Sequence, residues 1–112
     1  MAMEIQPGVR ALGTDPAPGL LHIRGADAQS FLQGQLSNDM SALSADRWLL
    51  AGLHNPQGRV LALLQLAVLA PEFIIALLPA ELASATIATL ARYVLRAKVA
   101  LSDESNAAAL AA

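Results

Sequence analysis

His54-Asn55-Pro56-Gln57-Gly58-Arg59 is the stretch that decides the fold, because it joins two long apolar runs. Pro56 presets φ for a turn, the Asn55 side chain can close the turn, and Gly58 accepts a positive φ. The runs on either side are 47–53 (RWLLAGL) and 60–69 (VLALLQLAVL). Two apolar runs joined in this way predict an antiparallel hairpin.

A second turn, Ala70-Pro71-Glu72, sends the apolar run 73–78 back along the hairpin. The stretch 47–78 is therefore predicted to form a three-stranded meander, and the rest of the chain is expected to pack around it. Its strands are apolar on both faces, whereas antiparallel sheets commonly leave one face to water.

Shorter elements flank the meander. Residues 20–24 predict a strand, and Gly25-Ala26-Asp27 opens a helix with Asp27 in the first turn, where the helix dipole favours an acid. A second helix is predicted from Pro79 to about Leu95, and 98–101 is predicted to be a last short strand. Both helices carry a one-sided apolar stripe: Ala28, Phe31, Leu32 and Leu36 in the first, Ala83, Ile87, Leu90 and Val94 in the second.

The predicted order β-α-β-β-β-α-β indicates the α+β class, with two helices and a mainly antiparallel sheet. We expect a loose lead-in over 1–18, the folded domain over 19–102 and a tail over 103–112. Two helices can cover one face of the sheet only. The sequence therefore predicts association, either as a homo-oligomer or with further domains of the same protein.

Composition points the same way. The 112 residues are 55% hydrophobic and 14% charged, whereas soluble domains usually carry about 25% charged residues. A membrane span over 60–80 is not favoured, because Gln65 and Pro71-Glu72 interrupt the run and a charge is costly in a bilayer. The first 19 residues do not read as a signal peptide, so a cytoplasmic location is expected.

The composition also excludes some chemistry. The chain has no cysteine, which rules out disulfides, thiolate metal sites and a cysteine nucleophile. Its net charge of −2 gives no general attraction to nucleic acid. His22 and His54 lack the spacing of a metal site. We identify no catalytic group and no metal ligands, and we expect Trp48 to lie in the core.

Two polar groups are candidates for ligand contacts. Asn38-Asp39 follows the first helix in a loop; the alternative is an Asx turn that closes this loop. Arg92, Arg96 and Lys98 form a basic cluster near Tyr93. The alternative explanation of this cluster is that the C-terminus of the second helix attracts cations.

Four blocks together resemble the N-terminal part of the YgfZ-type folate-binding proteins, which are relatives of the glycine-cleavage aminomethyltransferase, or T-protein. The blocks stand in order over about 20–102: LHIRGADA (21–28), FLQGQLSND (31–39), NPQGRV (55–60) and RYVLRAKV (92–99). Such proteins are longer and carry a downstream K-G-C-Y-x-G-Q-E signature, which is absent here. The resemblance therefore implies the first segment of such a protein, or a shortened relative.

The resemblance implies a tetrahydrofolate-binding scaffold, not itself an enzyme, that helps to assemble or maintain iron-sulfur clusters in client enzymes, including tRNA-modifying ones. The T-protein turn resembles N-x-x-G-G-V-x-D-D, and an aspartate after it serves aminomethyl transfer. Ala62 and Leu63 stand at the two aspartate positions, which disfavours a folate-dependent aminomethyltransferase. Gly19 stands where some relatives have an aromatic residue.

Residue chemistry then assigns expected roles in a folate site. Asn38 and Asp39 are expected to hydrogen-bond a pterin edge, and Asn55 and Arg59 to meet polar or carboxylate groups. Arg96 and Lys98 are the expected anion-binding residues, for a glutamate tail or an RNA phosphate. The alternative that remains open is a small self-associating domain without a ligand.

Overall fold

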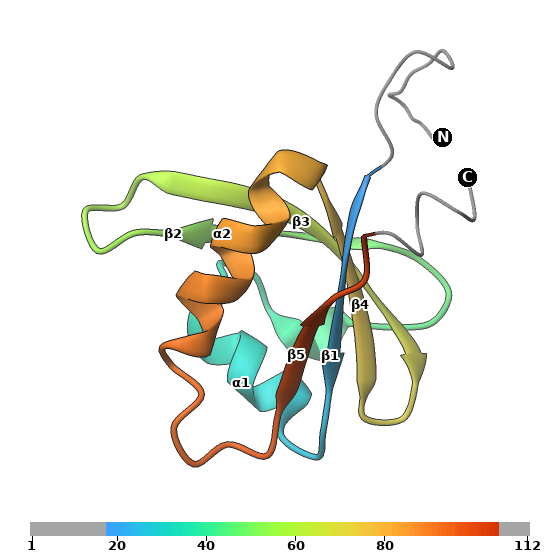
Figure 1. Ribbon diagram of the computed structural model, residues 1–112. Coiled ribbons are helices and arrows are strands. Elements are labelled where there is room, and N and C mark those ends of the chain that lie inside the picture. The colour runs from blue at the N-terminus through green and yellow to red at the C-terminus, as the bar shows by residue number, and fades with distance from the viewer. Residues whose placement is uncertain (1–17, 106–112) are drawn as a thin grey trace, which may run out of the picture.

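The computed structural model describes residues 18–105. Its elements are β1 (Gly19–Arg24), α1 (Ala28–Gln35), a short 3-10 helix η1 (Met40–Ala42), β2 (Leu49–His54), β3 (Val60–Ala70), β4 (Phe73–Leu78), α2 (Ala80–Ala91) and β5 (Ala100–Asp103). The strands form one sheet in the order β2-β3-β4-β1-β5, with every pair antiparallel. Both helices lie on the same side of this sheet (Figure 1). The predicted α+β class and the meander are confirmed.

The turn between β2 and β3 forms as the sequence predicts. The side-chain oxygen of Asn55 accepts hydrogen bonds from the backbone N–H groups of Gln57 at 3.0 Å and Arg59 at 2.9 Å. Gly58 has a φ of 86° and donates its N–H to the Asn55 carbonyl at 2.9 Å. One asparagine side chain therefore fixes the conformation of the whole turn.

The core lies between the helices and the sheet face beneath them. Leu32 of α1, Leu64 of β3 and Leu90 of α2 are completely buried, and burial of such a side chain contributes roughly 1.5–3 kcal/mol. The predicted stripe of α1 is buried throughout. In the second stripe, Ala83 and Leu90 are buried, whereas Ile87 and Val94 are half-buried.

The loop between β1 and α1 lies against the segment that leads into β5. Gly25 has a φ of 137°, and a Cβ there would overlap the carbonyl oxygen of Lys98. Asp27 was predicted to lie in the first turn of α1, but it is the N-cap residue that precedes this turn. Its carboxylate makes no capping bond and instead accepts the backbone N–H of Lys98 at 2.8 Å.

The end of α2 and the start of β5 differ from the prediction. α2 ends at Ala91 rather than near Leu95, because the N–H groups of Tyr93 and Val94 turn back to carbonyls only three residues earlier. β5 begins at Ala100 and continues to Asp103, since the backbone of Lys98 is bonded to Asp27 instead of a strand. The strand thus includes Asp103, the first residue of the expected tail.

Trp48 is a further correction, because 47% of its surface is exposed and it is not a core residue. It precedes β2, where the chain has not yet entered the sheet. Met40, the first residue of η1, is completely buried in the core. This burial was not predicted from the sequence.

The expected lead-in and most of the expected tail lie outside the described residues. Within residues 18–105, neither helix has the length and apolar character that a membrane crossing requires.

Candidate functional site

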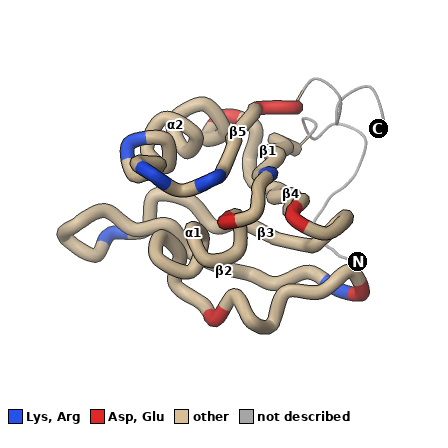
Figure 2. The backbone as a smooth tube through the Cα atoms, turned by 90° about the horizontal axis from the view of Figure 1, so that it is seen from below, with Lys and Arg blue, Asp and Glu red and all other residues tan. Residues whose placement is uncertain are grey.

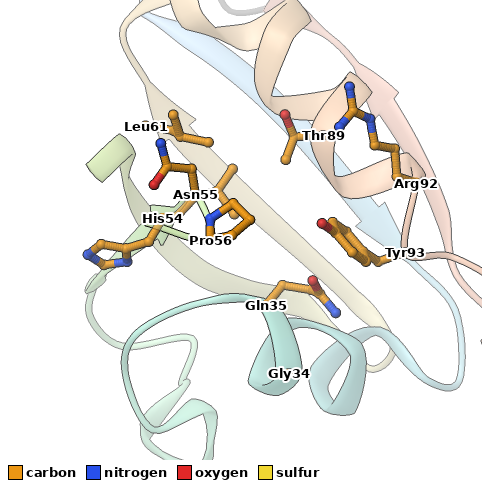
Figure 3. Close-up of a pocket in the computed structure, with 10 residues that line it drawn as sticks. Gly34, Gln35, His54, Asn55, Pro56, Leu61, Thr89, Arg92 and Tyr93 are labelled. Atoms are coloured by element: carbon orange, nitrogen blue, oxygen red, sulfur yellow. The ribbon is translucent and has the colours of Figure 1, made fainter. Parts of the chain in front are cut away.

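A cavity of about 380 Å³ opens at the turn end of the β2–β3 hairpin, where the last turns of α1 and α2 approach it. Figure 3 shows the three walls: the hairpin, the end of α1 below it and the end of α2 opposite. The lining residues are Gly34, Gln35, Leu53, His54, Asn55, Pro56, Leu61, Thr89, Arg92 and Tyr93. Ligand pockets commonly measure about 300–1,000 Å³, so this volume suits a small organic molecule or a part of one.

The hairpin supplies a rigid wall. Asn55 is held by the turn bonds, and Pro56 has a fixed φ. Figure 3 shows Pro56 and the Tyr93 ring on opposite sides of the space, whereas the His54 imidazole points away from it. The position of His54 is consistent with its expected place at the hairpin end, and the aromatic face available to a ligand is that of Tyr93.

The C-terminal ends of both helices border the cavity. The negative end of a helix dipole lies at this end, and in α2 the Leu90 and Ala91 carbonyls already accept the N–H groups of Tyr93 and Val94. Gly34 and Gln35 belong to the last turn of α1, and Thr89 to the last turn of α2. The helix residues with polar side chains in the lining are Gln35 and Thr89, together with Arg92 and Tyr93 just after α2. Nothing lies within 4 Å of the place where a Cβ on Gly34 would be.

A cation stands at the end of α2. Arg92 is the C-cap residue of α2 and is exposed, and Figure 3 shows its guanidinium beside Thr89. Arg96 and Lys98 follow on the connection to β5, and Figure 2 shows the cations between α2 and β5 as one group. No carboxylate is among the lining residues, so an anion reaching this rim meets positive charge.

The predicted pair Asn38-Asp39 lies outside the cavity lining. Asn38 donates its side-chain amide to the Leu50 carbonyl at 2.7 Å. Asp39 caps η1 by accepting the backbone N–H of Ser41 at 2.9 Å and its hydroxyl at 2.8 Å. These hydrogen bonds, the backbone one first, hold the pKa of Asp39 below its ordinary value. The structure thus has the loop-closing turn that the sequence left as the alternative, and the role of the pair in ligand binding stays a prediction.

Of the residues with an expected role in a folate site, Asn55 lines the cavity, and of the predicted basic cluster, Arg92 does so beside Tyr93. Arg59 is exposed in the turn, and Arg96 and Lys98 are exposed beyond the end of α2. Gln35 and Thr89 were missed, since nothing in the sequence distinguishes polar residues in the last turn of a helix from ordinary surface residues. Gly34 was the one usable signal in the sequence. A glycine within a helix lowers the stability of the fold, so its presence there suggests a packing or functional reason.

Ala62 and Leu63, which the sequence resemblance sets at the T-protein aspartate positions, lie on opposite faces of β3. Ala62 is buried beneath the helices, whereas Leu63 is exposed on the other face. Neither lines the cavity. Within residues 18–105, no three histidine, aspartate or glutamate side chains gather closely enough to hold a metal ion.

The fold and the cavity together define an α+β protein with a ligand-sized cavity at the turn end of its central hairpin. Among solved structures, the chain is similar to the glycine cleavage system aminomethyltransferase T from Bartonella henselae, with a TM-score of 0.71 and 21% sequence identity. The match covers 82% of this chain and 28% of that chain. The chain thus has an aminomethyltransferase-like fold and spans well under half the length of that enzyme. Neither family models nor curated protein sequences give a match.

Proposed function

We propose that this chain binds tetrahydrofolate in the cavity and does not itself transfer an aminomethyl group. The observation that carries the proposal is the meeting of Tyr93, Arg92 and two helix ends at one cavity in an aminomethyltransferase-like fold. The sequence resemblance to YgfZ-type folate-binding proteins supports the same ligand.

The chemistry of the cavity suits the parts of a folate. A pterin ring carries hydrogen-bonding groups for polar side chains such as that of Gln35, and a flat face for the Tyr93 ring. The glutamate end carries carboxylates, which form charge-assisted hydrogen bonds with a guanidinium such as that of Arg92. Arg96 and Lys98 lie further along the same connection, where a longer tail would pass.

The absence of a carboxylate from the lining supports binding without transfer. A buried alanine and an outward-facing leucine stand at the aspartate positions, so neither can hold or polarise an amine. We expect no turnover when the chain is supplied with tetrahydrofolate and an aminomethyl donor. By resemblance to the YgfZ type, the bound folate would serve iron-sulfur enzymes, including those that modify tRNA.

Calorimetric titration of the 112-residue chain with 5-formyltetrahydrofolate tests the proposal. Arg92→Gln should weaken binding about 10–100-fold, because a hydrogen bond between charged groups contributes roughly 1.5–3 kcal/mol. Arg47→Gln is the matched control, since Arg47 is also exposed but does not line the cavity.

Wild-type binding with a loss confined to Arg92→Gln supports the proposal. The proposal is contradicted if the wild-type chain shows no heat of binding with the folate, or if both substitutions weaken binding equally. Asp39→Ala in the same series decides whether the η1 loop contributes, because that loop is separate from the cavity.

A further inference from the structure

Three glutamines lie in α1, and their side chains differ in what they bond. Gln29 donates its amide to the Met40 carbonyl at 2.8 Å, and the side-chain oxygen of Gln33 accepts the Met40 N–H at 2.7 Å. Gln35 is half-buried and lines the cavity. Within residues 18–105, its carboxamide has no hydrogen-bond partner. Two of the glutamines therefore hold η1, whereas the third is left to the cavity.

The backbone around Gln35 is fixed. Leu36, the next residue, forms an isolated bridge with Leu53 of β2, and Ser37 donates its N–H to the Gly52 carbonyl at 2.9 Å. Figure 3 shows the Gln35 carboxamide extending from the end of α1 into the space between the cavity walls. A side chain on a backbone that is already ordered loses less freedom when it binds a ligand.

The other polar side chains of the lining offer less than a carboxamide. The Asn55 oxygen already accepts two turn N–H groups, so only its amide donor remains for a ligand. Arg92 can only donate, and Thr89 and Tyr93 each have a single hydroxyl. Among these groups, Gln35 alone offers a free acceptor and a donor side by side in one plane.

We infer that Gln35 recognises the edge of the pterin ring, an inference that rests on the proposed folate site. The N3–H donor and the O4 acceptor of a pterin lie next to each other. The carboxamide of Gln35 matches both, since its oxygen accepts the N3–H and its amide donates to O4. Carboxamides recognise the edges of nucleobases through such paired hydrogen bonds.

The same pairing defines which pterins the cavity accepts. When an amino group replaces O4, the order of donor and acceptor along this edge is reversed. A carboxamide that turns over about its last bond presents the reversed order, whereas a carboxylate has only acceptors and cannot do so. The cavity should therefore accept 4-oxo and 4-amino pterins alike.

Calorimetric titration of the 112-residue chain with folic acid and with aminopterin tests the inference. Folic acid has the N3–H and O4 of tetrahydrofolate, and aminopterin is its 4-amino analogue. The two dissociation constants should agree within about threefold. Gln35→Met keeps the length of the side chain and should weaken both about 10-fold, because two hydrogen bonds are lost. Gln57→Met is the matched control: Gln57 is exposed in the hairpin turn and does not line the cavity.

A measurement on the wild-type chain guards against misfolding of the variant. The side-chain NH₂ resonances of Gln35, assigned by their loss in Gln35→Met, should shift on addition of either pterin, and those of Gln57 should not. Unchanged Gln35 resonances, an unweakened Gln35→Met, or a preference of about 100-fold for one pterin would overturn the inference. If 5-formyltetrahydrofolate still binds through Arg92 in that case, the proposed function stands. If no folate binds the wild type, both fail.

Discussion

Short polar side chains close the loops of this chain. Asn55 holds the hairpin turn through two backbone N–H groups, and Asp39 caps η1 through Ser41. Asp103 accepts the backbone N–H of Ser105 after β5. In each case the acceptor lies within a few residues of the donor, and such local bonds are typical of Asx turns. A turn is therefore the first function to consider for an asparagine or aspartate in these loops.

The titration of Asp39 is a prediction at this scale. Its pKa is held below the ordinary value by the backbone and hydroxyl groups of Ser41. The carboxylate therefore stabilises the folded chain above the ordinary pKa, and this stabilisation is lost as the pH falls through the folded-state pKa. Ser41→Ala removes the hydroxyl but keeps the backbone donor, so the pKa should rise part of the way. Carboxyl NMR shifts against pH measure both values; an ordinary pKa in the wild type refutes the account.

Among the elements, long periodic segments were predicted and their ends were not. The hairpin and β4 followed from apolar runs separated by proline and glycine, and both helices from their stripes. The end of α2 escaped prediction because the stripe continues through Val94, while the backbone bonds of Tyr93 and Val94 end the helix sooner. The start of β5 depends on Asp27, a residue far away in sequence, which holds Lys98 outside the strand.

Gly34 gives the prediction at the scale of the element. It lies in α1 with open space around it, so Gly34→Ala should stabilise the chain by roughly 0.5–1 kcal/mol through a smaller loss of backbone entropy. The added methyl group would also narrow the cavity and should weaken folate binding. Thermal unfolding and calorimetric titration measure the two effects. A less stable variant, or a more stable one that binds folate as well as the wild type, would conflict with this account.

At the scale of the whole molecule, the sequence indicated the fold class and the surplus of apolar surface, but not the position of the cavity. Asn55 and Tyr93 lie 38 positions apart, and only the folded sheet brings the hairpin to the end of α2. In the sequence, Asn38 and Asp39 are as good candidates for a ligand site as Asn55, because all three are polar loop residues. In the structure, however, Asn38 bonds to the edge strand β2 and Asp39 to η1. Which polar residues share a cavity depends on tertiary packing, which local patterns do not encode.

The most direct test of the central claim is the amide NMR spectrum of the isotope-labelled chain, recorded during titration with 5-formyltetrahydrofolate. The account predicts that the largest shift changes fall on the three cavity walls, at Gly34, Asn55 and Tyr93, with Ser41 and Leu63 little affected. Changes centred on η1 or on Leu63, or no changes at all, would contradict the assignment of the cavity as the folate site.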